Sequence, residues 1–318
     1  MDQESSILHF VLGGEGFIGR TLVKNLVDSG SKVVVADIDI WNRGFSNDSD
    51  SISHLDLSQP SWAEKFSSAA SDSQQVRIWH LAANSDISRA ANDYALDFNI
   101  TLGSTIDIVK LAILLGKKCA SIEFTSSSAV YGNRIGNRKF QENDKLDPIS
   151  NYGVMKEASE KALQIYGTRH QVPVHIYRLA NIVGSGMTHG VIHDLVNKLK
   201  NENTFLDILG DGTQIKTYLH VEDLVQIMIK LSENPASLTL NVGPEDSGVR
   251  VAEIAKLILK VTGSNAELRF EDKAYGWLGD VVNSVMDVSK LKSLSGVQLR
   301  SSSLAVEDAI RSKVEEVF

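Results

Sequence analysis

The chain has 318 residues, of which 42% are hydrophobic, so it is long enough to bury one large core or two adjoining ones. Its net charge of −8 and its pI near 5.5 argue against nucleic acids and anionic membranes as partners. The single cysteine and the spacing of the eight histidines predict no disulfide framework and no metal site. No leader of basic residues followed by apolar ones opens the chain, and we expect that none of its apolar runs is long enough to span a membrane. A cytoplasmic location is therefore expected.

The first motif is a glycine turn between two predicted elements. Apolar residues over Ile7–Leu12 predict a buried parallel strand, and their helical spacing over Phe17–Val27 predicts a helix. Between them, Gly14, Gly16 and Gly19 have the spacing with which a backbone approaches a pyrophosphate and a helix packs closely on a strand. Free N–H groups and the dipole at the helix start favour phosphate. The pattern indicates a dinucleotide site, and a glycine turn without a ligand is the alternative.

An acidic residue follows at the expected distance. A second apolar strand, Lys32–Ala36, ends at Asp37, which lies 18 residues after Gly19. A carboxylate there accepts hydrogen bonds from the adenosine ribose and repels a 2′-phosphate, so NAD is favoured over NADP. Glu15 lies inside the glycine turn, and we expect a carboxylate so near a phosphate to point to solvent.

Strands and helices alternate through the first part of the chain. Further strands are predicted over residues 52–57, 76–81, 120–125 and 174–179, with helices over 93–115 and 152–170. This alternation predicts an α/β fold, a doubly wound parallel sheet of the Rossmann type, with a smaller α/β lobe behind it. We predict that residues 1–182, together with 218–243, form the NAD-binding domain, and that 183–217 and 244–318 form the substrate-binding lobe.

A hydroxyl-rich strand end and a later Tyr-x-x-x-Lys pair indicate the chemistry. Ser127 and Ser128 follow an apolar strand, where side chains of an open α/β sheet line the ligand crevice. Tyr152 and Lys156 are four residues apart on a helix and therefore share a face. The ammonium lowers the pKa of the phenol, which then works as a general base on a substrate hydroxyl. An incidental pair at an exposed helix start is the alternative.

These motifs together resemble the extended short-chain dehydrogenase/reductase family, in its branch of NAD-dependent nucleotide-sugar epimerases and dehydratases. The matching segments are Gly13–Gly19, Asp56-Leu57, His80–Ala83, Asn99-x-x-x-Gly103, Ser126–Gly132, Arg178-x-x-Asn181, Gly210–Gln214 and His220–Asp223. The resemblance implies cofactor contacts from Gly13, Gly16, Phe17, Ile18, Gly19, Asp37, Asp56, Leu57, Leu81, Ala82, Ala83, Asn99, Tyr152 and Lys156. It implies catalysis by Ser127, Tyr152 and Lys156, and substrate contacts from Ser127, Ser128, Asn181, Lys216 and Trp277.

The implied mechanism is a transient oxidation at the sugar C4. Tyr152 deprotonates the 4-hydroxyl of a nucleotide sugar, such as a UDP-sugar, while hydride passes to NAD⁺, and hydride then returns to the other face of the 4-keto sugar. Dehydratases of this family have acids at the positions of Ser128 and Ala129, and decarboxylases have a Glu at the position of Ala129. Because this chain has no acid at either position, the resemblance favours a 4-epimerase similar to UDP-glucose 4-epimerase. A 4-keto-sugar reductase is the main alternative, and a non-catalytic NAD-binding regulator is a further one.

The chain departs from the family pattern at two positions. Lys216 and Trp277 stand where the family has arginines, so a bidentate grip on a diphosphate is lost and the nucleotide sugar is left open. Ser284 falls where some epimerases have a bulky residue over the sugar 2-position, which leaves room for an N-acetyl group. The family pairs through two long helices, so residues 93–115 and 152–166 predict a homodimer.

Overall fold

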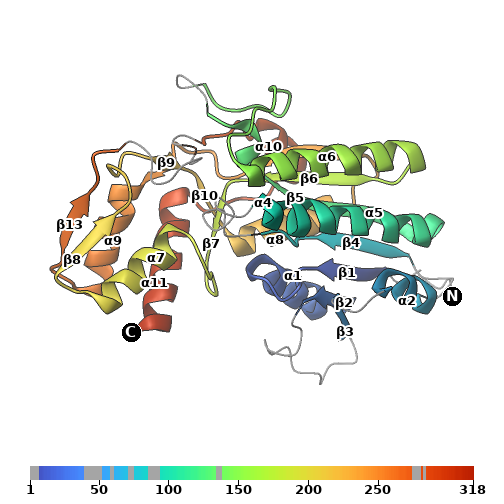
Figure 1. The fold of residues 1–318 in the computed structure, drawn as a ribbon, viewed down its shortest axis with the longest axis horizontal. Coiled ribbons are helices and arrows are strands. Elements are labelled where there is room, and N and C mark those ends of the chain that lie inside the picture. Colours follow the sequence, from blue (N-terminus) through green and yellow to red (C-terminus); the bar gives the residue numbers. More distant parts are fainter. Residues whose placement is uncertain are drawn as a thin grey trace.

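The computed structural model describes residues 7–38, 52–57, 61–70, 75–84, 94–133, 138–273, 281 and 284–318. Its first lobe is built on a seven-stranded sheet in which each neighbouring pair is parallel. The strands lie in the order β11 (Leu238–Val242), β6 (Val174–Leu179), β5 (Cys119–Ser127), β4 (Val76–His80), β1 (Leu8–Leu12), β2 (Lys32–Asp37) and β3 (Ile52–Asp56). The predicted doubly wound parallel sheet is therefore confirmed (Figure 1).

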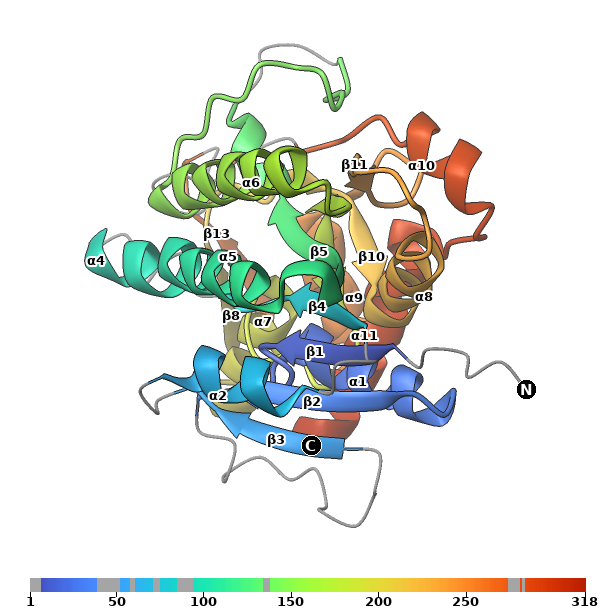
Figure 2. The ribbon, with the colours of Figure 1, turned by 90° about the vertical axis from the view of Figure 1, so that its right-hand side faces the viewer.

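Helices cover both faces of this sheet because its central strands are apolar on both sides (Figure 2). Along β2, for example, Val33 and Val35 face one core while Val34 and Ala36 face the other. The first core is closed by α1 (Phe17–Asp28), α8 (Val221–Leu231) and α10 (Ser289–Ser295). The second is closed by α2 (Trp62–Ala69), α5 (Gly103–Leu115) and α6 (Asn151–His170).

Strand β11 and helix α8 were not among the predicted elements, although their residues were assigned to the first domain. They follow an excursion of the chain into the second lobe, after which β11 pairs with β6 and α8 packs against α1. With α10, which lies in the range predicted for the substrate-binding lobe, the first lobe is thus assembled from three separate stretches of sequence.

The second lobe has its own apolar core. It is formed by α7 (Val191–Asn201), α9 (Val251–Thr262), α11 (Ser302–Val317) and the parallel pair β8 (Phe205–Ile208) and β13 (Glu267–Phe270). Two short ladders lie toward the first lobe in Figure 1, namely β7 (Asn181–Val183) with β10 (Tyr218–His220), and β9 (Ile215–Lys216) with β12 (Val249–Arg250). After residue 182, where the rhythm of the sequence changes, the chain enters this core at Val183.

A helical stretch over Ala95–Lys118 corrects one expectation from the sequence. It joins α4 (Tyr94–Asp97), the π-helix η2 (Phe98–Leu102), α5 and the 3₁₀ turn η3 (Gly116–Lys118), and by length and composition it could cross a membrane. A core helix of this length passes the same test, and Ile108, Leu111 and Leu115 pack against the sheet. The expectation that no apolar run is long enough was wrong, because this helix is apolar toward the sheet and also on part of its outer face.

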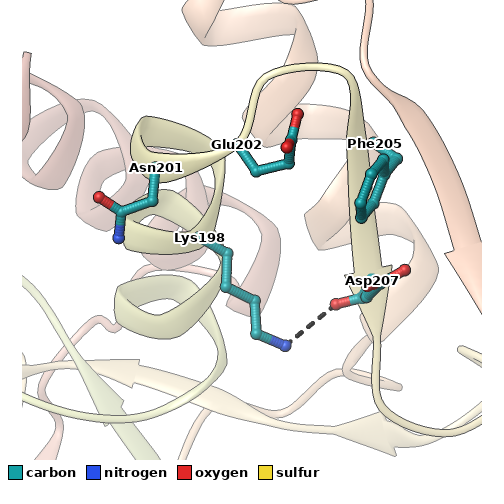
Figure 3. Close-up of a pocket in the computed structure, with 5 residues that line it drawn as sticks. All are labelled: Lys198, Asn201, Glu202, Phe205 and Asp207. Atoms are coloured by element: carbon teal, nitrogen blue, oxygen red, sulfur yellow. Dashed lines mark hydrogen bonds between the residues drawn. The ribbon is translucent and has the colours of Figure 1, made fainter.

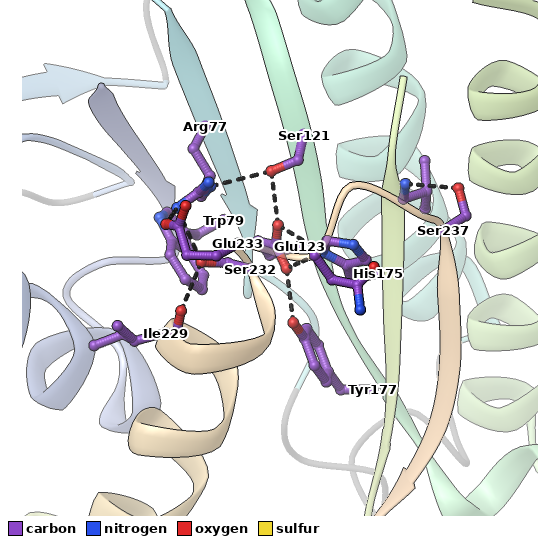
Figure 4. A network of polar contacts seen from close by, with 12 residues as sticks. Arg77, Trp79, Ser121, Glu123, His175, Tyr177, Ile229, Ser232, Glu233 and Ser237 are labelled. Carbon is purple, nitrogen blue, oxygen red and sulfur yellow. Dashed lines mark hydrogen bonds and ion pairs between the residues drawn. The ribbon is translucent and has the colours of Figure 1, made fainter. Parts of the chain in front are cut away.

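A buried polar network ties the inner strands to the end of α8 (Figure 4). Glu123 on β5 and His175 on β6 are both fully buried, and Nδ1 of His175 lies 2.9 Å from a carboxylate oxygen of Glu123. Tyr177 and Ser121 each donate a hydrogen bond of 2.7 Å to this carboxylate. Arg77 on β4 donates to Ser121 at 3.2 Å and to the residues that follow α8. Each oxygen of the buried carboxylate therefore has a donor, as burial of a charge requires.

Candidate active site

The glycine turn after β1 packs against the loop after β4. Gly13 has φ +82°, and a Cβ added there would lie 2.8 Å from the backbone nitrogen of Ala82. A Cβ at Gly19 would lie only 2.2 Å from the carbonyl oxygen of Gly13, so α1 begins as close to the turn as a backbone can. Gly16 is the N-cap of α1 and has no side chain to fill the helix start. The turn thus leaves the first N–H groups of α1 available to an anion.

The remaining predicted cofactor residues lie at the ends of neighbouring strands. Asp37 ends β2 and is in register with Asp56 at the end of β3, and the Leu57 N–H donates to the Asp37 carbonyl at 3.0 Å. Leu81 follows β4, and its N–H donates to the Leu12 carbonyl at 2.9 Å. Phe17 and Ile18 open α1, and Ala82 and Ala83 continue the β4 loop. The structure therefore brings these predicted residues to the carboxyl edge of the sheet.

Glu15 does not point to solvent as expected. Glu15 is only 4% exposed, and one of its carboxylate oxygens accepts a hydrogen bond of 3.0 Å from the half-exposed Arg20. Its backbone N–H donates to the Asp37 carboxylate at 3.0 Å. The expectation failed because the arginine, one turn into α1, balances the charge inside the protein. First-turn acids, which would repel a phosphate, are absent from α1.

Ser127, Tyr152 and Lys156 converge at the end of β5. Ser127 is the last residue of β5, and its Oγ accepts the Ala129 N–H at 3.2 Å. The Ser127 hydroxyl also favours the ionised form of Tyr152. Helix α6 starts at Asn151 because the Ser150 hydroxyl caps it by accepting the Gly153 N–H at 3.2 Å. The buried Lys156 ammonium lies 5.7 Å from the centroid of the Tyr152 ring and donates to the Thr125 carbonyl at 2.6 Å.

Burial opposes the charged forms of this pair. It raises the pKa of Tyr152 to about 12, against the Ser127 hydrogen bond, while the charge of Asp97 raises that pKa further. Burial likewise lowers the pKa of Lys156 to about 7, although the charges of Glu160 and Asp97 raise it. Charges placed near the pair therefore decide how well it acts as a base at neutral pH.

The helix that faces this pair presents a different residue from the predicted one. Asp97 is fully buried, as are Thr101 and Thr105 one and two turns later, whereas Asn99 is exposed on the opposite side of the helix. Asn99 therefore does not share the buried face of Asp97, and its predicted cofactor contact stays a prediction. The π-helix η2 starts directly after Asp97, and such turns are frequent at functional sites. The sequence signal for Asp97 is the four-residue spacing of polar residues in an otherwise apolar helix.

A second buried network supports the strand end from behind. Ser126 donates to Glu160, whose carboxylate is held by Arg178 through contacts of 2.7 and 3.0 Å. Arg178 also donates to the Tyr131 hydroxyl at 2.9 Å, and that hydroxyl donates to Asn241 at 2.6 Å. These bonds connect β5 and α6 to β11. They fix the position of the strand end that carries Ser127.

On the substrate side, Asn181 and Lys216 are neighbours. The Asn181 amide donates to the carbonyl of Thr217 at 3.2 Å, directly after Lys216 in β9. Ser128 follows Ser127 and is buried in the 3₁₀ turn η4 (Ser128–Tyr131). Trp277 lies outside the described residues.

A surface pocket of about 280 Å³ lies elsewhere, on the second lobe between α7 and β8 (Figure 3). It is lined by Lys198, Asn201, Glu202, Phe205 and Asp207, and the Lys198 ammonium donates to the Asp207 carbonyl at 3.1 Å. None of the predicted residues lines it. We assign the candidate active site to the carboxyl edge of the sheet, because the sequence motifs converge there.

The model of the NAD dependent epimerase/dehydratase family matches residues 9–243. The chain belongs to this family. Its cofactor is NAD, and the structure fits that molecule: the bare helix start, the close approach at Gly19 and the carboxylate of Asp37 provide the places for its diphosphate and ribose.

Individual relatives have several activities. The chain is 31% identical over 173 residues to an uncharacterized UDP-glucose epimerase of Bacillus subtilis, a match that covers 54% of this chain and 53% of the relative. It is 27% identical over 299 residues to a UDP-N-acetyl-alpha-D-glucosaminuronate decarboxylase of Bacillus cytotoxicus, covering 89% of this chain and 90% of the relative. A crystal structure of UDP-galactose 4-epimerase is 31% identical, with a TM-score of 0.83 and coverage of 98% and 100%.

Proposed function

We propose that the protein is an NAD-dependent nucleotide-sugar 4-epimerase in which Tyr152 is the base on the sugar 4-hydroxyl. The observation that supports this is the end of β5, where Ser127, Ser128 and Ala129 follow one another without a carboxylate. The resemblance places the acids of dehydratases, and the Glu of decarboxylases, at the last two of these positions. Without them, elimination lacks its acid and base, whereas proton removal from a hydroxyl needs only the Ser127, Tyr152 and Lys156 group.

Each of the three residues has a task that its position permits. Tyr152 takes the proton of the 4-hydroxyl as a phenolate and later gives it back. Lys156 supplies the positive charge that stabilises this phenolate, and its bond to the Thr125 carbonyl holds it under the ring. The Ser127 hydroxyl favours the Tyr152 phenolate and orients the reacting oxygen of the sugar. NAD, when bound, accepts and returns the hydride at C4.

We propose a UDP-sugar as the substrate class, since the relatives above act on UDP-sugars by their names. Asn181 and Lys216 lie together where the second lobe meets the first, and a single ammonium there attracts a diphosphate as a point charge. Ser284 is buried, and its hydroxyl has no hydrogen-bond partner among the described residues. A small polar residue at that place fits a sugar with a 2-N-acetyl group.

The comparisons keep a decarboxylase open as an alternative. A 4-keto-sugar reductase, which would use the same three residues, is the other alternative. The decarboxylase relative matches nearly the whole chain, so similarity alone does not separate these activities. Retention of Tyr152 and Lys156 argues against a non-catalytic regulator.

The test is turnover by the purified protein, with NAD⁺ added, on UDP-, dTDP- and GDP-sugars, including UDP-glucuronate and UDP-N-acetylglucosamine. A 4-epimer without net NADH, absent with Tyr152→Phe, supports the proposal. Release of CO₂ from a UDP-uronate assigns a decarboxylase instead. Consumption of NADH or NADPH by a 4-keto sugar, with no epimer from any substrate, assigns a reductase.

We also propose that two copies of the chain pair through α5 and α6, which lie side by side on one face of the sheet (Figure 2). Apolar side chains are exposed along both elements. Phe98 and Ile113 lie on the helical stretch Ala95–Lys118, which contains α5, and Val154 and Ile165 lie on α6. Sedimentation should show a dimer that Ile165→Asp weakens. Leu304→Asp, an exposed leucine on α11, is the control that should leave it intact. A monomeric wild type contradicts the proposal.

A further inference from the structure

Asp97 is a buried acid close to the proposed base that the mechanism above does not use. It ends α4, which packs against α6, the helix of Tyr152 and Lys156. Its Oδ1 accepts a hydrogen bond of 2.8 Å from the amide of Asn84, which follows the β4 loop, whereas Oδ2 has no partner among the described residues. A fully buried carboxylate with one bare oxygen is costly unless a positive charge lies nearby.

Lys156 is a buried cation on α6, the helix against which α4 packs. Its ammonium is buried and makes one hydrogen bond, to the Thr125 carbonyl. Burial lowers the pKa of Lys156, and the charge of Glu160 and then that of Asp97 raise it. Burial raises the pKa of Asp97, and the charge of Lys156 lowers it.

The other titratable groups around Lys156 are already compensated or neutral. The charge of Glu160, on the same helix, raises the pKa of Lys156 more than that of Asp97 does, but Glu160 is bound through both oxygens to Arg178 and so has a cation of its own. His80 on β4 shares a hydrogen bond of 2.8 Å with Thr105, and burial, assisted by the charge of Lys156, keeps its pKa well below the usual value, so it is neutral. Among the described residues, Asp97 is thus the acid near Lys156 that has no other cation paired with it.

We propose that Asp97 is a positioning residue of the active site, whose buried carboxylate serves as the counter-ion of Lys156. The inference rests on the proposed function, since it assigns Asp97 a role in the same proton transfer. The carboxylate favours the ammonium form of the buried Lys156, and only the ammonium stabilises the Tyr152 phenolate. The cost of this arrangement is that the same negative charge also disfavours the phenolate directly.

The sign of the expected effect follows from this double action. Asp97→Asn removes a negative charge, which makes the binding of a proton to Tyr152 or to Lys156 less favourable. Both apparent pKa values of the Tyr152 and Lys156 pair should therefore fall in this variant. The acid and alkaline limbs of the pH–rate profile should therefore move in the same direction, toward lower pH, by about one pH unit. A loss of packing alone would lower the rate at every pH and leave the limbs in place.

The experiment measures pH profiles of kcat/KM for the NAD-loaded wild type, Asp97→Asn, Asp97→Glu and Asp28→Asn. Asp97→Glu keeps the charge and should restore the wild-type limbs at least in part. Asp28→Asn is the matched control, because Asp28 is exposed at the far end of α1 and pairs only with Lys24 among the described residues. Unmoved limbs in Asp97→Asn overturn the proposal, as does a shift of equal size in the control.

A second readout needs no turnover. Ionisation of Tyr152 is followed by phenolate absorbance near 295 nm, as the difference between each protein and the same protein with Tyr152→Phe. The midpoint should fall by about one pH unit in Asp97→Asn, and an unchanged midpoint overturns the proposal. If no sugar is epimerised but this midpoint falls, the proposed function fails while the role of Asp97 as a charge on the pair stands.

Discussion

Gly19→Ala tests the close contact on which the cofactor site depends. In the structure an added Cβ lies 2.2 Å from the carbonyl oxygen of Gly13 and 2.7 Å from Cα of Gly14, whereas real Cβ contacts essentially never fall below 3.0 Å. Both neighbours are backbone atoms, which cannot rotate away as a flexible side chain can. The start of α1 must therefore move away from the turn.

The expected magnitude follows from overpacking. Forcing a methyl group into a filled site costs about 1–3 kcal/mol. For a chain of this size, each kcal/mol lowers Tm by roughly 2 °C, so we expect a fall of about 4 °C for the middle of that range. Because the displaced helix start carries the N–H groups for the diphosphate, NAD affinity should also fall by about tenfold or more, or about 1.4 kcal/mol.

Thermal unfolding and calorimetric titration with NAD measure the two effects separately. Gly103→Ala is the control, because a Cβ there meets its nearest neighbour, the Phe98 carbonyl oxygen, at an ordinary 3.5 Å. In a helix that change should be neutral or stabilising, by at most about 1 kcal/mol. Wild-type stability and NAD affinity in Gly19→Ala would refute the reasoning that α1 needs this contact.

Three further predictions concern other parts of the first lobe. Asp37→Ser should weaken NAD binding by about tenfold and improve the ratio of NADP to NAD affinity, because the carboxylate no longer repels a 2′-phosphate; an unchanged ratio in parallel titrations would contradict this. Arg178→Met should lower the free energy of unfolding by about 3–5 kcal/mol in denaturant titration, since Glu160 is left as an unbalanced buried charge, and Glu160→Gln in the same chain should recover part of the loss. Burial lowers the pKa of His175, but the hydrogen bond and charge of Glu123 outweigh this and raise it above its usual value. The stabilisation by the His175 and Glu123 pair is therefore complete below about pH 6.5 and is lost as the pH rises through the raised pKa of His175. In His175→Gln the free energy of unfolding should consequently differ less between pH 6 and pH 8 than it does in the wild type. An equal difference in both proteins would contradict this role of the pair.

The parts of the fold that the sequence predicted are those with a strong local signal. The strand ending at Asp37, for example, is a continuous apolar run over Val33–Ala36, because a parallel strand buried on both faces requires one. The glycine turn and the spacing of Tyr152 and Lys156 are likewise fixed by backbone geometry. For β11 the partner strand lies more than fifty residues earlier, so its pairing depends on the tertiary fold.

The errors at the site also have a physical reason. Whether Glu15 is buried depends on Arg20 reaching back over the first turn of α1, which spacing does not reveal. The inward position of Asp97, and the outward one of Asn99, depends on how the helix containing a π turn is rotated against the sheet. Motif spacing assumes a regular helix, and a single wide turn is enough to change which residue faces the base.

The return of the chain to the first lobe has a consequence for its synthesis. Strand β6 remains an open edge, and the apolar side of the sheet beneath α8 remains uncovered, until residues up to Val242 have been made. The nascent chain must therefore pass through the length of the intervening segment, β7 to β10, before its first lobe can close. Since an unpaired strand edge invites pairing with other chains, we expect a ribosome-bound or truncated product ending near residue 182 to aggregate through β6 more readily than the full chain.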